Sequence, residues 1–307
     1  MIATEEQPAT SSTNYYLTRE EIDFFHENGY LGPFKLFEPK EAKELWERTL
    51  RPQMFNRSRN VYRDSVLNYD RHLDNPILNS IVCNPRIVHR LNGIMGKNLL
   101  SWRTEWFPKY PGDEGTEWHQ AKHFYEFEGV PKLMPTEHSP RFWGMTAWIA
   151  FTESDLENGC IKVMPKTHNN WYFDESRSVK HDKALVNQKQ VEEEKRGFFG
   201  YDWDKLKIDP NWKADESQAK YLEMKAGEFF IFTSQCMHGS FPNTSKNRSR
   251  FAMSSRYCTT DVRVYPDQTE YTSLGETLSL DRYRTVLVSG EDTYNYNKSI
   301  PAYTLPD

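Results

Sequence analysis

Two of the nine histidines stand in contexts suited to metal binding. His119 follows a glycine-containing turn, and His238 follows the apolar run Phe229–Phe232, so both are expected at strand ends. Neutral imidazole is a common metal ligand, although a purely structural role for both histidines is the alternative. Arg250 lies twelve residues after His238, and its planar guanidinium can bind a carboxylate through two parallel hydrogen bonds. Taken alone, this pattern is weak evidence: it fits a metal held by two imidazoles beside a carboxylate-binding arginine, but it fits two structural histidines better.

Helical signals dominate the first third of the chain. Thr18 and Glu21 have the spacing of a capping box, which marks the beginning of a helix. Pro39 stands in the first turn of a second predicted helix, a position that proline favours. Residues 76–95 carry apolar side chains at helical spacing, with an interruption expected at Pro85. These helices must pack against whatever sheet follows them.

From about residue 98 the composition changes to that of short strands. Strands are predicted at residues 99–107, 146–151, 160–163, 228–232 and 250–257. Asn158-Gly159 is a strong signal for a tight turn before one of them. Helices followed by many short strands favour a mainly β fold with flanking helices, a double-stranded β-helix of the jelly-roll, cupin-like kind.

One domain is predicted, because 307 residues suffice for a single large hydrophobic core. It covers residues 15–307 and includes a helical N-terminal part at 17–96 and a charged, lid-like insertion at about 168–220. Residues 1–14 are polar and without periodicity, so we expect a flexible tail.

Composition excludes several classes of function. The chain has 39 Lys and Arg against 44 Asp and Glu, and a formal charge of -5 argues against binding to nucleic acid or an anionic membrane. Its apolar runs fall short of the roughly 18 residues that a membrane span needs. Four cysteines are scattered singly, so a thiolate zinc site is not expected. With no secretory signal, these features indicate a reducing, cytoplasmic setting.

The order of His119, His238 and Arg250 resembles that of iron(II)/2-oxoglutarate oxygenases, in which an H-x-D/E pair and a distal histidine bind the metal. Here the acidic position is Ala121. The chain looks like the syringomycin-biosynthesis type of aliphatic halogenase, within the phytanoyl-CoA dioxygenase superfamily. The likeness extends from about Leu17 to about Tyr296. It is carried by Asn68–Asp74, Trp102–Ala121, Arg196–Asp202 and Ser254–Tyr257.

This resemblance implies a role for each candidate site residue. His119 and His238 would bind iron(II), and the short side chain of Ala121 would leave one metal position open for a halide. Ser234 and Arg256 would lie beside that halide. With two neutral imidazoles and a dianionic 2-oxoglutarate, the iron(II) could then accept one external anion in place of the missing acidic side chain.

The remaining roles follow from the same resemblance. Arg250 would bind the distal carboxylate of 2-oxoglutarate, and Thr116 and Trp148 would line its binding site. The residues expected near the substrate are Phe124, Phe199 and Glu126, and Glu105 would orient Arg256 or a water molecule. Glu126 is a departure from the relatives, because a carboxylate close to a bound anion is unfavourable.

The implied activity is radical chlorination of an unactivated sp3 carbon with iron(II), 2-oxoglutarate, O2 and chloride. The substrate would be an aliphatic amino acid held as a thioester on a carrier protein, in nonribosomal peptide or related natural-product biosynthesis. Carrier proteins are usually acidic, so basic side chains of the insertion would form the docking face, unless they only solvate it. These are Arg177, Lys180, Lys183, Lys189 and Lys195.

Three alternatives remain open at this point. A hydroxylase of the same fold would recruit a carboxylate from elsewhere, such as Glu117 or Glu126. A catalytically silent jelly roll would only bind a partner, although it would have no need of two histidines and an arginine together. A zinc hydrolase is the weakest alternative, since no acidic third ligand accompanies the histidines.

Overall fold

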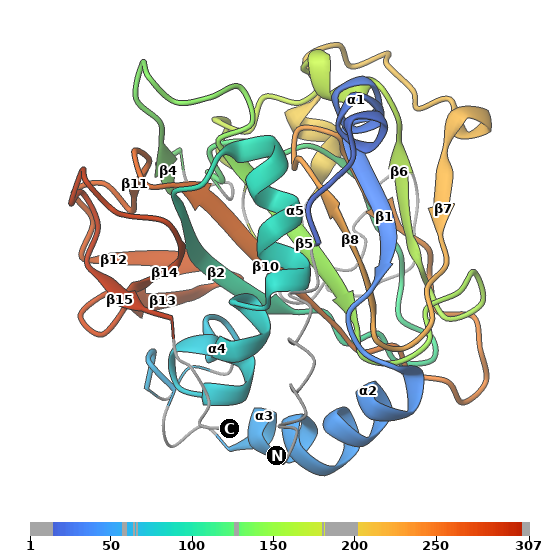
Figure 1. Ribbon diagram of the computed structural model, residues 1–307. Coiled ribbons are helices and arrows are strands. Elements are labelled where there is room, and N and C mark those ends of the chain that lie inside the picture. Colours follow the sequence, from blue (N-terminus) through green and yellow to red (C-terminus); the bar gives the residue numbers. More distant parts are fainter. Residues whose placement is uncertain are drawn as a thin grey trace, which may run out of the picture.

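Two β-sheets form the frame of the molecule, with helices on one side (Figure 1). The computed structural model describes residues 15–56, 60–63, 65, 67–125, 129–179, 181 and 202–302. The larger sheet has seven strands in the order β1-β8-β5-β10-β2-β14-β15, and the smaller has four in the order β3-β9-β6-β7. Two two-stranded sheets, β4 with β11 and β12 with β13, complete the described strands. This arrangement is a jelly roll of the cupin-like kind, as predicted.

The helices gather in the first hundred residues. The α-helices are α1 (Arg19–Asn28), α2 (Pro39–Leu45), α3 (Arg51–Phe55), α4 (Pro76–Val82) and α5 (Pro85–Met95), with a π-helical turn η1 (Trp46–Leu50). Short 3-10 turns are η2 (Arg71–Leu73), η3 (Thr167–Asn169), η5 (Trp203–Leu206) and η6 (Glu216–Gln218).

The strands begin at residue 30. The larger sheet comprises β1 (Tyr30–Lys35), β2 (Leu99–Trp106), β5 (Gly144–Ala150), β8 (Glu228–Phe232), β10 (Ala252–Thr259), β14 (Thr285–Ser289) and β15 (Ser299–Pro301). The smaller sheet comprises β3 (Thr116–His119), β6 (Ile161–Met164), β7 (Lys220–Leu222) and β9 (Met237–Ser240). The short pairs are β4 (Leu133–Met134), β11 (Arg263–Val264), β12 (Glu270–Ser273) and β13 (Glu276–Ser279).

The helix predictions are confirmed at their ends. The Thr18 hydroxyl accepts from the Glu21 N–H at 3.2 Å, and the Glu21 carboxylate accepts from the Thr18 N–H at 2.8 Å. Gly29 ends α1 with a φ of 81°, a left-handed conformation that glycine adopts without steric cost. Pro39 begins α2, and the region 76–95 divides into α4 and α5 at Pro85.

All five predicted strands are present, as β2, β5, β6, β8 and β10, and the structure contains further strands that were not predicted. β10 begins at Ala252, two residues later than predicted, because Arg250 forms only an isolated bridge with Lys109. β1 was not predicted, and it pairs with β8, so the N-terminal part is not purely helical. The strands after residue 260 were not predicted either. The predicted tail, residues 1–14, and much of the insertion lie outside the described residues.

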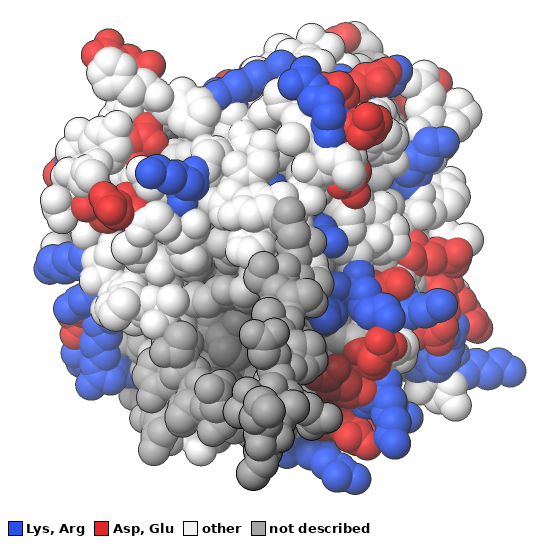
Figure 2. Space-filling model, viewed as in Figure 1, with Lys and Arg blue, Asp and Glu red and all other residues white. Residues whose placement is uncertain are grey.

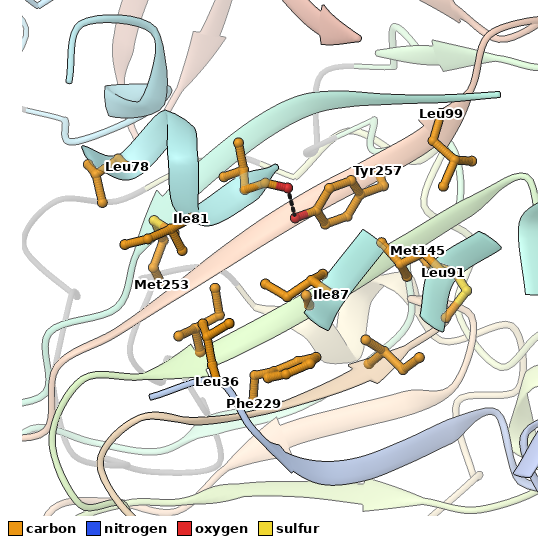
Figure 3. Close-up of a cluster of buried hydrophobic side chains, with 14 of the residues drawn as sticks. Leu36, Leu78, Ile81, Ile87, Leu91, Leu99, Met145, Phe229, Met253 and Tyr257 are labelled. Atoms are coloured by element: carbon orange, nitrogen blue, oxygen red, sulfur yellow. Dashed lines mark hydrogen bonds between the residues drawn. The ribbon is translucent and has the colours of Figure 1, made fainter. Parts of the chain in front are cut away.

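A hydrophobic core fills the space between the helices and the larger sheet (Figure 3). Leu78 and Ile81 of α4 and Leu91 of α5 contribute to it, each with at most 3% exposure. The Tyr257 hydroxyl on β10 donates to the Val82 carbonyl at 2.9 Å, which satisfies the one polar atom that this side chain buries. The buried faces of α4 and α5 therefore pack against the face of the larger sheet that points away from the smaller sheet.

The second core lies between the two sheets. Strand β8 alternates, so Phe229 and Ile231 face the helices while Phe230 and Phe232 face the smaller sheet. A strand buried on both faces explains the unbroken apolar run in the sequence. None of the four cysteines forms a disulfide, and three of them, Cys160, Cys236 and Cys258, are buried.

Charges of both signs alternate on the surface around α2. Figure 2 shows Lys and Arg interleaved with Asp and Glu at the lower right of this face. Lys35 and Glu38, at the beginning of α2, form an ion pair of 2.7 Å with both side chains more than half exposed. Among the described residues, no helix has the length and apolarity required to cross a bilayer.

Candidate active site

The fold brings the two candidate histidines into direct contact. His119 is the last residue of β3 and His238 lies on β9, and the two are register partners in the smaller sheet. Their ring centroids are 4.2 Å apart with an interplanar angle of 52°. Because both strands belong to a sheet that packs on the larger one, the imidazoles are held at the inter-sheet cavity rather than on loops.

Hydrogen bonds fix the tautomer of each imidazole. Nδ1 of His119 lies 2.8 Å from the Glu117 carbonyl, and Nδ1 of His238 lies 2.9 Å from the Cys236 carbonyl. A carbonyl only accepts, so Nδ1 carries the proton and Nε2 keeps a lone pair. Burial lowers the pKa of His119 to about 4, and burial together with the neighbouring His119 holds the pKa of His238 well below its usual value. Both rings are therefore neutral near pH 7, as metal-binding imidazoles must be.

Ala121 lies beside this pair at the wall of the cavity, which has a volume of about 160 Å³. Its N–H donates to the Ser234 carbonyl at 2.9 Å, which fastens the segment after β3 to the segment before β9. The Ser234 hydroxyl lies 3.1 Å from the Thr146 hydroxyl and also lines the cavity. A methyl group at position 121 offers no donor atom to a metal.

Arg250 presents a guanidinium nitrogen to the same cavity. The side chain is 2% exposed and stacks on Trp148, with its guanidinium carbon 5.1 Å from the ring centroid. Two of its nitrogens donate to the carbonyls of Gly159 and Phe107, whereas Nε has no hydrogen-bond partner among the described residues. Burial lowers the pKa of Arg250 to about 10, so the group stays charged at neutral pH. A buried cation with an unused donor fits a carboxylate ligand.

Thr116 lies on β3, opposite Ser240 of β9. The Ser240 hydroxyl donates to the Thr116 hydroxyl at 2.9 Å and accepts from the buried Lys109 ammonium at 2.7 Å. The pKa of Lys109 is lowered by burial and by the nearby Arg250. Thr116 and Trp148 both line the cavity on the side of Arg250.

Glu105 joins two arginines on the larger sheet. Its carboxylate lies 2.5 Å from Nη2 of Arg256 and 2.9 Å from Nη2 of Arg103, and all three side chains are at most 14% exposed. Register explains the contact, since Arg256 of β10 pairs with Arg103 of β2. Nη1 of Arg256 has no hydrogen-bond partner among the described residues, so the cavity has a second unused cationic donor.

Aromatic side chains form the apolar walls. Phe124 lies over the Arg256 guanidinium, 4.8 Å from ring centroid to guanidinium carbon, and contacts Trp102 edge-on at 5.2 Å. The ring centroids of Trp203 in η5 and His119 are 4.4 Å apart. No motif in the sequence predicts this contact. Phe199 and Glu126 lie outside the described residues.

Glu175, which the insertion contributes, also lines the cavity with its carboxylate, and sequence analysis did not predict it as a site residue. It accepts hydrogen bonds from three consecutive backbone N–H groups after Ala121. The proposed substitute Glu117 lies on β3 but does not line the cavity as described. No signal in the sequence could have found Glu175, because its partners are backbone groups.

The residues fit iron(II) and 2-oxoglutarate. Two neutral imidazoles with free Nε2 lone pairs can hold the metal, and the unused Nε of Arg250 can bind a carboxylate. Within the described residues, no group of three or more His, Cys, Asp and Glu side chains converges on a metal position. His119 and His238 are thus the two protein ligands that this part of the chain offers.

Comparison with known proteins shows the family. The model of the phytanoyl-CoA dioxygenase family matches residues 25–252. The structure of CytC3 with Fe(II) and alpha-ketoglutarate is 35% identical and superposes with a TM-score of 0.72, covering 94% of this chain and 95% of that chain. A second CytC3 structure is 36% identical with a TM-score of 0.70, covering 94% of each chain.

More distant structures share the fold alone. EctD from S. alaskensis, solved with 2-oxoglutarate and 5-hydroxyectoine, is 14% identical with a TM-score of 0.60, covering 96% of this chain and 92% of that chain. No curated protein sequence matches the chain. The family match, the two-histidine site and the buried arginine agree with one another. The chain therefore belongs to the phytanoyl-CoA dioxygenase family of iron(II)- and 2-oxoglutarate-dependent oxygenases.

Proposed function

We propose that the chain is an iron(II)- and 2-oxoglutarate-dependent halogenase. It chlorinates an unactivated sp3 carbon of an aliphatic amino acid that a carrier protein presents as a thioester, in nonribosomal peptide or related biosynthesis. The observation that carries the proposal is Ala121 beside the His119–His238 pair, where an oxygenase of this family needs an acidic ligand. A further support is the unused Nη1 donor of Arg256 in the same cavity.

The reaction balances with chloride as a substrate. A C–H bond, chloride, 2-oxoglutarate, O2 and one proton give a C–Cl bond, succinate, CO2 and water. Bound iron(II) with 2-oxoglutarate would activate O2, and O2 supplies the oxidising power that removes the hydrogen atom from the substrate carbon. The chain itself binds, orients and excludes water.

Each cavity residue has a defined part in this proposal. His119 and His238 hold the metal as neutral imidazoles. Arg250, stacked on Trp148 and near Thr116, binds the distal carboxylate of 2-oxoglutarate. The Arg256 guanidinium, held by Glu105, attracts the halide toward the side of Ala121 and Ser234. Its position matters, because an anion in a buried site needs a fixed cationic donor.

The apolar walls decide which atom the substrate radical collects. Trp203 bounds the cavity beside His119, Phe124 bounds it beside Arg256, and Phe199 remains a predicted wall. A displacement of about 1 Å in the bound substrate costs about a hundredfold in rate. Chlorination over hydroxylation therefore depends on how these rings hold the target carbon.

A hydroxylase needs a protein carboxylate at the metal. The two carboxylates that line the described cavity are already bound, Glu105 by two guanidinium groups and Glu175 by backbone N–H groups. Releasing either leaves buried donors unsatisfied, at about 1–3 kcal/mol for each. Because of this cost, an external anion is favoured over Glu105 or Glu175 as the additional metal ligand.

The proposal is tested by reconstitution. The protein is loaded anaerobically with iron(II), 2-oxoglutarate and chloride, then exposed to O2 with a panel of aminoacyl carrier proteins, and products are read by intact mass. We expect one or more hydrogens to be replaced by chlorine, with its isotope pattern. Hydroxylation alone, in the presence of chloride, would establish the hydroxylase instead, and absence of both iron binding and 2-oxoglutarate turnover would indicate a binding module.

Substitution at position 121 tests whether the absence of an acidic ligand there is required for chlorination. Ala121→Asp supplies the missing ligand, so we expect it to abolish chlorination while iron binding persists. Ala121→Gly is the matched control, because it keeps the position open and should still chlorinate. Chlorination by the aspartate variant at the parent rate would contradict the proposal.

Docking of the carrier protein is assigned to the basic insertion. Arg177, half-exposed, is partly engaged already, since it binds Asp174 at 3.2 Å and donates to the carbonyls of Lys205 and Lys207. Lys180, Lys183, Lys189 and Lys195 lie outside the described residues. Charge reversal of these four lysines, with Arg177 left intact, should raise the KM for the tethered substrate without changing that for 2-oxoglutarate. Unchanged turnover would place docking elsewhere.

A further inference from the structure

Glu175, a residue of the insertion, binds the backbone beside the candidate active site through its carboxylate. Oε1 of Glu175 accepts from the N–H of His123 at 2.7 Å and of Lys122 at 3.2 Å. Oε2 accepts from the N–H of Phe124 at 3.1 Å and of Lys122 at 3.1 Å. Three consecutive amides therefore converge on one buried anion, and such charge-assisted hydrogen bonds are about twice as strong as neutral ones.

These amides belong to the segment that directly follows Ala121. The other end of the segment is held separately, since the Ala121 N–H donates to the Ser234 carbonyl and the Gln120 side-chain amide donates to the Gln235 carbonyl. Glu175 thus controls only the part after Ala121. Without it, three partly buried N–H groups would lose their acceptor.

Phe124 shows why the segment needs such a restraint. Its φ is 53°, in the left-handed region that a bulky residue seldom adopts. Residues held in this region are strained and persist only where their surroundings compensate. The hydrogen bond from the Phe124 N–H to Glu175 supplies that compensation at the strained residue itself.

The strained backbone places the Phe124 ring on Arg256. In this position the ring covers the guanidinium and packs against Trp102. A chain of contacts therefore leads from the insertion through Glu175 and Phe124 to Arg256, which lines the cavity. Relaxation of Phe124 would remove one side of the cage around this guanidinium.

We propose that Glu175 is a positioning residue for the anion site. It fixes the backbone of Lys122–Phe124 and thereby holds the Phe124 ring against Arg256, which sets the affinity for the halide. This inference rests on the proposed function in one respect, the assignment of Arg256 to halide binding. It separates halide affinity from iron affinity, because the two histidines lie on strands that Glu175 does not touch.

The test compares Glu175→Ala with Glu216→Gln. Glu216 also ties the insertion to the smaller sheet, to β3 through Trp118 Nε1 at 2.6 Å and to β6 through Lys162 at 3.0 Å, but it does not line the cavity. It is therefore a control for loss of an insertion contact as such. Glu175→Gln is a second variant, which keeps one acceptor oxygen but sets an NH2 group against N–H donors.

Hydrogen exchange of the metal-free protein is the first measurement. We expect the amides of residues 122–124 to exchange about tenfold faster or more in Glu175→Ala, while the Ala121 amide keeps its protection. Glu216→Gln should exchange like the parent. Parent-like protection at residues 122–124, or loss of protection throughout the chain in both Glu175 variants, would overturn the inference.

Anaerobic titration is the second measurement. Iron(II) and then chloride are titrated into the protein with 2-oxoglutarate, and binding is followed by the charge-transfer absorption. We expect chloride affinity to fall about 10- to 100-fold in Glu175→Ala, with iron affinity unchanged. Equal losses of iron and chloride affinity would refute a specific role. If the parent binds no halide, the proposed function fails alone, since the exchange pattern still decides what Glu175 does.

Discussion

Replacing Glu105 by glutamine tests the charge balance of the cavity. The carboxylate lies between Arg103 and Arg256, at 2.9 and 2.5 Å, and all three side chains are nearly buried. Glutamine has the same shape but offers one acceptor and one donor. Its NH2 group must face one of the two guanidinium groups, so at least one ion pair is lost and a buried cation is left without a counter-charge.

The structure sets the size of the effect. Breaking a buried ion pair by removing one partner costs about 3–5 kcal/mol, because the remaining charge stays desolvated. For a chain of 307 residues the unfolding entropy is about 0.6 kcal/mol per kelvin. The melting temperature of Glu105→Gln should therefore fall by roughly 5–8 °C.

Thermal and urea unfolding of the metal-free protein measure this loss, with Asp23→Asn as the control. Asp23 pairs with Arg19 at 3.1 Å on α1, where both side chains are more than half exposed. Such pairs contribute about 0–1 kcal/mol, so the control should melt close to the parent. Chloride should stabilise Glu105→Gln more than the parent, because an anion can replace the missing carboxylate.

Two outcomes would refute this reasoning. A loss below about 1 kcal/mol in Glu105→Gln would mean that the two guanidinium groups are effectively solvated, like exposed pairs. Equal responses of variant and parent to chloride would mean that Arg256 does not present a binding position to small anions.

Two further predictions concern Arg250 and Asp70. Arg250→Lys should weaken 2-oxoglutarate binding about 10- to 100-fold in an anaerobic titration, because an ammonium cannot form the paired hydrogen bonds of a guanidinium. The control Arg248→Lys, on the surface, should leave 2-oxoglutarate binding unchanged. Burial raises the pKa of Asp70 to about 6, so the folded state binds the extra proton and stability falls as pH rises from about 4 to above 6. Asp70→Asn should remove this fall, which amounts to about 1 kcal/mol between pH 5 and pH 7 in urea unfolding of the parent, and an identical pH dependence of both proteins would contradict it.

Much of the frame could be predicted from local signals. Several elements form where expected because their signals lie within a few residues. These signals are the apolar runs of β5 and β8, the capping box of α1 and the proline at the first position of α5. β1 was missed because its sequence, Tyr30–Lys35, contains Gly-Pro, which is atypical of a strand. It forms because β8 offers an edge that must be paired.

The site was predictable where it depends on residue type and not where it depends on tertiary contact. His119, His238 and Ala121 could be identified from their motif, although β3 and β9 are four-residue strands without clear alternation. Glu175 and Trp203 come from the insertion, far along the chain, and reach the cavity only through the fold. Their partners are backbone amides and an imidazole ring, which leave no pattern in sequence.

The substitution at position 121 changes the kind of equilibrium that governs the site. An aspartate would be present at fixed stoichiometry, whereas an external anion occupies the position according to its concentration and affinity. Under the proposed function, the Arg256 guanidinium would favour that occupancy, and the carboxylates of Glu105 and Glu175 are already held by other partners. Turnover should therefore rise with halide concentration to a plateau, and a rate independent of halide would show that the open position is not used.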